Sequence, residues 1–134
     1  MYESDYILRM IAQLGGLLRR VVTELRTDPA EALRLAEEAV RTSAGTGASL
    51  IDALSAEGLV AYLSAGGELD VARAVVLAHA LGARAAALEA GGDAVRAEAQ
   101  RGKMTALLAA ARSADADLTA SVEGELDGEA VGGA

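Results

Sequence analysis

Apolar residues recur at helical spacing along most of the chain. In residues 3–26 they fall three and four positions apart and form one broad face, which predicts a single helix. The same periodicity predicts helices over residues 29–42 and 93–113. Alanine is frequent and runs of β-branched residues are absent, so no strand is expected.

In the middle of the chain, the pattern predicts shorter and less regular helical segments. Two helical segments are expected over residues 50–54 and 55–65. They are followed by an apolar stretch over residues 68–90, which is one long helix or two helices joined at Gly82. We therefore expect an all-α fold of five or six helices packed as antiparallel hairpins.

Several helix boundaries carry residues that stabilise helix ends. Asp28 is followed by Pro29, and Glu31 stands three positions after it. The aspartate accepts a hydrogen bond from a free backbone N–H, proline needs no such bond at the first helical position, and Glu31 is expected to reach back to the cap. Two helical segments end in Gly-Gly followed by an acid, at residues 66–68 and 91–93. These signals predict short connections between neighbouring helices.

The last part of the chain differs from the rest in composition. After Arg112 there are six acidic residues, no Lys or Arg, and several glycines. Such a segment has little apolar surface with which to order itself. We therefore expect a helical domain of residues 1–113 and a disordered acidic tail of residues 114–134. The tail acts as a solubility segment or, alternatively, as an acidic mimic that shields a basic site.

Composition limits both the core and the chemistry. Hydrophobic residues make up 52% of the 134 residues but aromatic residues only 2%, so the core must be built from Ala, Leu, Val and Ile. The length corresponds to one domain. The chain has no Cys and one His, which excludes disulfide scaffolds, thiol catalysis and cysteine-based metal centres.

The distribution of charge disfavours nucleic acids as partners, and the shortness of the uncharged runs disfavours a membrane span. The net charge is −8, and the basic residues form no cluster that would attract a phosphate backbone. The longest uncharged runs, such as residues 74–83, are shorter than the ~20 residues that span a bilayer. Glu3 and Asp5 stand where a signal peptide would be positively charged. We expect a cytoplasmic location.

Few residues suggest chemistry. His79 lies in an apolar helix, where it serves in packing or at an interface, or else as a ligand or proton-transfer group. Residues 45–49 are either a flexible connection or an anion-binding turn, and they lack the ending of a phosphate-binding loop. Glu37 and Glu38 are expected on the solvent side of their helix. Since no nucleophile–base pair or metal cluster is visible, we expect no catalysis, metal or cofactor.

The N-terminal segment carries the most unusual surface. Tyr2, Tyr6 and Met10 are spaced four positions apart and form a stripe beside the apolar face. Tyr and Met are enriched at interfaces, so the stripe either completes the core or forms a protein-binding or dimer face. The candidate protein-binding residues are Tyr2, Asp5, Tyr6, Arg9, Met10 and Gln13.

The same segment resembles the opening of an uncharacterised bacterial all-helical family. Residues 1–14 read Met-Tyr-Glu-Ser-Asp-Tyr-Ile-Leu-Arg-Met-Ile-Ala-Gln-Leu. Members of that family begin Met-Tyr-Glu-x-Asp-Tyr-Ile-x-Arg-Met-Ile. The resemblance extends to about residue 112 and implies a helical, tetratricopeptide-like fold with no assigned chemistry. Residues 81–111, with a Gly-Asp turn, also resemble a tetratricopeptide hairpin.

Helical hairpins of this kind form grooves rather than active sites. We therefore expect a protein-interaction or scaffold module that binds a helix or peptide of an unidentified protein partner. One alternative is a homodimer that uses the N-terminal helix as its interface. Another is a small-ligand or lipid-sensing pocket in the space left by small side chains.

Overall fold

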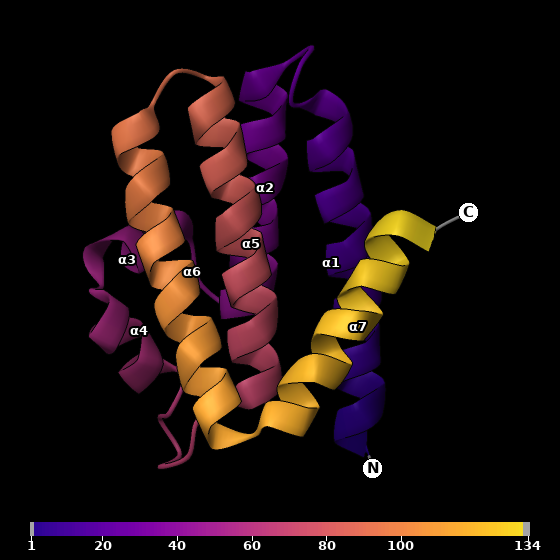
Figure 1. Ribbon diagram of the computed structural model, residues 1–134, viewed down its shortest axis with the longest axis vertical. Coiled ribbons are helices and arrows are strands. Elements are labelled where there is room, and N and C mark those ends of the chain that lie inside the picture. The colour runs from indigo at the N-terminus through magenta and orange to yellow at the C-terminus, as the bar shows by residue number, and fades with distance from the viewer. Residues whose placement is uncertain (1, 133–134) are drawn as a thin grey trace.

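The computed structural model is built from α-helices alone over the residues that it describes, which are the backbone of residues 2–132 and the side chains of residues 5–128. The seven helices are α1 (Tyr2–Glu24), α2 (Pro29–Ala44), α3 (Ala48–Ala53), α4 (Ala56–Tyr62), α5 (Val71–Ala90), α6 (Ala94–Ala114) and α7 (Ala116–Gly132). Figure 1 shows α6, α5 and α1 side by side, with α7 running obliquely across α1. The all-α class is confirmed, and α7 raises the number of helices above the five or six expected.

The helix ends follow from local side chains. The Asp28 carboxylate accepts a hydrogen bond from the backbone N–H of Glu31 at 3.1 Å, with Pro29 in the first turn, as predicted. The Glu31 side chain does not reach back to Asp28, because it pairs with Arg34 at 2.7 Å. The same type of N-cap contact is made by Ser55, Asp70, Asp93 and Asp115.

Helix α5 is the centre of the bundle. It contacts α1, α2, α6 and α7, and Leu77 and Leu81 are completely buried. It runs unbroken through Gly82, where a Cβ atom would lie 2.9 Å from the Met104 sulfur, so glycine allows α6 to approach closely. It begins at Val71, later than expected, because Asp70 caps it.

The length and composition of α5 alone would also suit a membrane span, although 72% of its most apolar segment is buried inside the protein. Such burial is usual for the central helix of a bundle. The core around α5 consists of Ala, Leu, Val and Ile with Met10 added, in agreement with the composition. Fully buried alanines such as Ala36, Ala39 and Ala78 let neighbouring helices pack closely.

Residues 116–132 form α7, so the expectation of a disordered tail over residues 114–134 is wrong for this segment. Thr119, Val122 and Leu126 lie three and four positions apart and are only 1%, 3% and 1% exposed. Helix α7 packs on α1, α5 and α6. The expected boundary at residue 113 is therefore not a domain boundary, because the C-terminal helix shares the core of the others.

Polar contacts also hold α7 in place. His79 Nε2 on α5 lies 3.0 Å from Glu123 Oε2 on α7, and both side chains are partly buried. Arg112 near the end of α6 approaches the other oxygen of Glu123 at 3.7 Å. The single histidine thus serves as a packing and tethering residue between two helices.

Candidate functional site

The aromatic stripe of α1 divides between the surface and the core. Tyr6 is 46% exposed, whereas Met10 is only 5% exposed and belongs to the hydrophobic core. The side chain of Tyr2 lies outside the described residues. Met10 therefore completes the core, and the protein-binding alternative applies to Tyr6 alone among the described members of the stripe.

Tyr6 is held in place by an arginine from the start of α5. Arg73 Nη2 donates a hydrogen bond to the Tyr6 hydroxyl, and its guanidinium carbon lies 5.8 Å from the centre of the ring. Arg73 Nη1 also donates to the backbone carbonyl of Ser43 at 2.8 Å, near the end of α2. The N-terminal part of α1 is thus fixed against two other helices.

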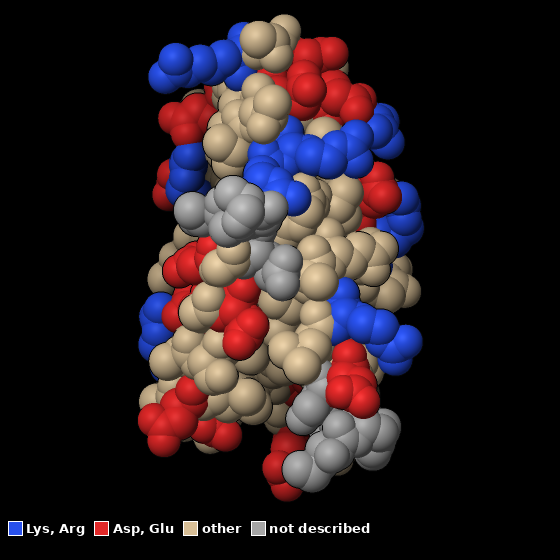
Figure 2. Space-filling model, turned by 90° about the vertical axis from the view of Figure 1, so that its right-hand side faces the viewer, with Lys and Arg blue, Asp and Glu red and all other residues tan. Residues whose placement is uncertain are grey.

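A groove of about 1120 Å³ opens beside Tyr6, between α1, the start of α5 and α7. Its floor is apolar and includes the buried side chains of Ile11, Val71 and Val122. Leu8 on α1 and Leu118 on α7 border it and are 49% and 41% exposed. Figure 2 faces this side of the molecule, where an uncharged band runs upward with acidic side chains on its left and both basic and acidic side chains on its right.

The charged residues that line the groove are all acidic in the described part of the chain. They are Glu68, Asp70, Asp115 and Glu125, and all four are exposed. Asp70 lies 3.6 Å from Arg73, and Asp115 caps α7. Within the described residues, Glu68 and Glu125 have no ion-pair partner. The rim therefore has negative charge available for a cationic ligand.

The structure does not bring the other predicted residues of α1 into the groove. Asp5, Arg9 and Gln13 are exposed, and none of the three lines the groove. The structure instead adds Leu8 and Leu118, which the sequence analysis did not select. Leu8 belongs to the apolar face predicted for residues 3–26 but is 49% exposed, and Leu118 lies in the segment that was expected to be disordered.

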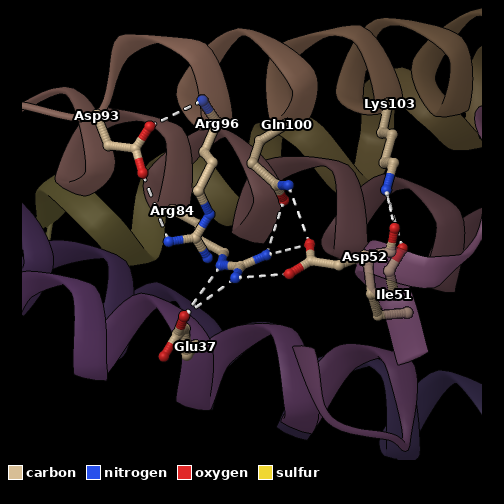
Figure 3. Close-up of polar contacts among 8 residues, drawn as sticks. All are labelled: Glu37, Ile51, Asp52, Arg84, Asp93, Arg96, Gln100 and Lys103. Atoms are coloured by element: carbon tan, nitrogen blue, oxygen red, sulfur yellow. Dashed lines mark hydrogen bonds and ion pairs between the residues drawn. The ribbon is translucent and has the colours of Figure 1, made fainter. Parts of the chain in front are cut away.

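A second polar cluster surrounds Arg84 of α5, which is buried, whereas the carboxylates of Glu37 and Asp52 reach the surface (Figure 3). Arg84 is 1% exposed, and its guanidinium pairs with both Asp52 oxygens, at 2.6 and 3.0 Å. It also contacts Glu37 Oε2 on α2 at 3.1 Å and Gln100 Oε1 on α6 at 3.2 Å. The expectation that Glu37 faces solvent holds in part: its side chain is 36% exposed, and its carboxylate also helps to neutralise the buried charge of Arg84.

Helix α6 completes the cluster. Gln100 Nε2 donates to Asp52 Oδ1 at 3.1 Å, and Lys103 Nζ donates to the backbone carbonyl of Ile51 at 2.9 Å. Among the described residues, no buried side-chain nitrogen or oxygen lacks a hydrogen-bond partner. The buried members of the cluster, Arg84 and Gln100, are satisfied by its own groups, so the cluster joins α2, α3, α5 and α6.

The contacts of the cluster shift the acidity of its members. Hydrogen bonding from Arg84 holds the pKa of Asp52 below its usual value, against the opposing effect of burial. Burial disfavours the charge on Arg84, but the hydrogen bond and charge of Asp52 outweigh it and raise the pKa of Arg84. Both groups are therefore charged in the folded protein at neutral pH.

A pH dependence of stability follows from the lowered pKa of Asp52. The stabilising contribution of Asp52 is present above its unfolded pKa of about 3.9 and is lost as the pH falls through the lower folded pKa. We expect Asp52→Asn to reduce the loss of stability between about pH 5 and pH 3, measured by urea unfolding. Glu31→Gln is the control, because hydrogen bonding from Arg34 also lowers the pKa of Glu31, but Arg34 is 59% exposed whereas Arg84 is buried. Equal slopes for Asp52→Asn and the wild type would contradict the expectation.

The remaining sequence candidates acquire structural roles. Gly45 ends α2 with φ of +77°, and Gly47 precedes α3, so residues 45–47 connect the two helices. Residues 48–49 begin α3, which has six residues. No group of three or more His, Asp or Glu side chains in the described part of the chain is arranged to hold a metal ion.

Comparison with known proteins provides no assignment. The resemblance of residues 1–14 to an uncharacterised bacterial family stays a prediction, as does the tetratricopeptide-like character of the hairpins. No family model matches the chain, and no curated protein or solved structure is significantly similar to it.

Proposed function

We propose that this chain is a protein-interaction module whose partner occupies the groove between α1, α5 and α7. The observation that carries the proposal is the exposure of three large apolar side chains around one groove. Tyr6, Leu8 and Leu118 are 46%, 49% and 41% exposed and all line it. Apolar patches with polar rims are typical of surfaces that bind other proteins.

The open form of the groove favours a macromolecular ligand over a small one. Small-molecule pockets enclose most of the surface of their ligand. This groove is instead bordered by partly exposed side chains such as Leu8 and Leu118. Tetratricopeptide-like hairpins, which the resemblance implies, are scaffolds of the kind that present such grooves. The proposal includes a cytoplasmic location and assigns the chain no catalytic role.

Photo-crosslinking from the groove tests the proposal. A photoreactive phenylalanine derivative is placed at Leu8 in the full chain, expressed in the cell from which the protein comes. We expect a discrete adduct with another protein after irradiation, because Leu8 is exposed at the groove and bears no part of the core. Leu8 is preferred to Tyr6, since Tyr6 also bonds Arg73 and its replacement would disturb packing.

The matched control is the same substitution at Val22. Val22 is 69% exposed and lies near the other end of α1, away from the groove. An adduct from position 8 that is absent from position 22 supports the proposal. An adduct of twice the 13.5 kDa chain mass assigns the groove to a homodimer instead. Identical patterns from both positions, or no adduct from position 8, contradict the proposal.

A further inference from the structure

We infer that the groove binds a basic amphipathic helix of a partner protein, an inference that rests on the proposed function. Helix-in-groove recognition places the apolar face of a helix into an apolar groove, while its flanking charges meet the rim. Here the floor is formed by apolar residues such as Ile11, Val71 and Val122. Leu8 and Leu118 stand on opposite walls and would contact the two sides of such a helix.

The rim determines the charge of the partner. Its four charged residues among those described, Glu68, Asp70, Asp115 and Glu125, are acids and are exposed. Glu68 and Glu125 have no ion-pair partner in the described part of the chain. Lysine or arginine side chains along the partner would therefore find unpaired carboxylates, whereas acidic side chains would be repelled.

The length of the groove determines the size of the segment. One wall extends along α7 from Leu118 to Glu125. At 1.5 Å per residue, this wall is about 10 Å long, which accommodates about two turns of a helix. Two turns provide apolar positions at i, i+3, i+4 and i+7, enough to contact both walls and the floor.

A designed peptide tests the inference directly. The probe is a fluorescein-labelled peptide of about 16 residues, with leucine at helical spacing and lysine elsewhere. Its binding to the full chain is followed by fluorescence anisotropy. We expect saturable 1:1 binding, and at least about tenfold weaker binding of the same peptide with glutamate in place of lysine.

Charge reversal shows whether the rim is responsible. The Glu68→Lys/Glu125→Lys variant is expected to bind the lysine peptide at least about tenfold more weakly than the wild type, and to bind the glutamate peptide better. The control is Glu57→Lys/Glu98→Lys, which changes the net charge equally on α4 and α6. Both control residues are exposed and lie outside the groove. This control is expected to bind the lysine peptide as the wild type does, within about twofold.

The outcomes separate the inference from the proposed function. Loss of lysine-peptide binding in the rim variant but not in the control supports the inference. Equal loss in both variants means that binding follows overall net charge, and it overturns the inference. Absence of peptide binding also overturns it. If the crosslink from position 8 is still observed in that case, the groove remains a protein-binding site and only the basic helix is excluded as its occupant.

Discussion

Replacement of Arg84 by alanine is expected to lower the free energy of unfolding by about 3 kcal/mol, because it leaves two carboxylates without their cation. Removing one member of a buried ion pair costs roughly 3–5 kcal/mol. Asp52 and Glu37 have side chains that are 37% and 36% exposed, so water relieves part of the cost and the lower end applies. Thermal unfolding should show a fall of about 10 °C in Tm.

Arg96→Ala is the matched control for this prediction. Arg96 is an arginine on α6 that pairs with Asp93 at 3.6 Å, but its side chain is 53% exposed. Its replacement should change the free energy of unfolding by no more than about 0.5 kcal/mol. If Arg84→Ala and Arg96→Ala are equally stable, the buried cluster does not join the four helices.

A double-mutant cycle provides a second measurement in case Arg84→Ala does not fold. Arg84→Met keeps much of the aliphatic stem, and Asp52→Asn removes the charge that faces it. The free-energy changes of the two variants should fail to add, with an interaction energy of about 1–3 kcal/mol between the positions. Additive changes would mean that the contacts of 2.6 and 3.0 Å between these residues contribute little to stability.

Much of the helical framework was predictable because its signals are local. Asp28 with Pro29 begins α2, and Asp93 after Gly-Gly begins α6. Each signal acts through a hydrogen bond to a residue three positions away, so neighbouring residues in the sequence are enough to identify it. The alanine-rich core was also predictable, from the composition and from the helical spacing of the apolar residues.

The Arg84 cluster was not predictable, because its partners are distant in sequence. Glu37, Asp52 and Gln100 lie 47, 32 and 16 positions from Arg84. The one signal present was a charged residue in the middle of an apolar helix, on the side occupied by the buried residues Leu81 and Leu88. Helical periodicity shows that such a residue points inward, but it does not identify which side chains meet it.

Helix α7 escaped prediction because its stability does not come from its own sequence. Glycines at positions 124 and 128 each cost about 1 kcal/mol relative to alanine in a helix. Glu125 and Asp127 lie in its second half, where negative charge opposes the helix dipole. Packing on α1 and α5 compensates for these effects. Since α7 also forms one wall of the groove, the candidate site could not be predicted without this helix.

Leu126→Ala is expected to lower the free energy of unfolding by about 3 kcal/mol, since truncation of a buried leucine costs about 2–5 kcal/mol. Leu126 lies on the buried face of α7 and is 1% exposed, whereas Leu118 on the same helix is 41% exposed. Leu118→Ala should therefore change stability by no more than about 0.5 kcal/mol, and it is the matched control in chemical denaturation. If α7 were disordered, neither substitution would change the free energy of unfolding.

Removal of residues 116–134 should have the larger effect, because it uncovers the surfaces of α1, α5 and α6 on which α7 packs. Loss of the buried Val122 and Leu126 alone corresponds to about 3–5 kcal/mol. The helical circular dichroism should then fall by more than the share of the 17 residues of α7, because the neighbouring helices also lose support. A fall no larger than that share, with an unchanged Tm, would mean that the remaining helices fold without α7. In that case Leu126→Ala should also be nearly neutral, so the two measurements must agree.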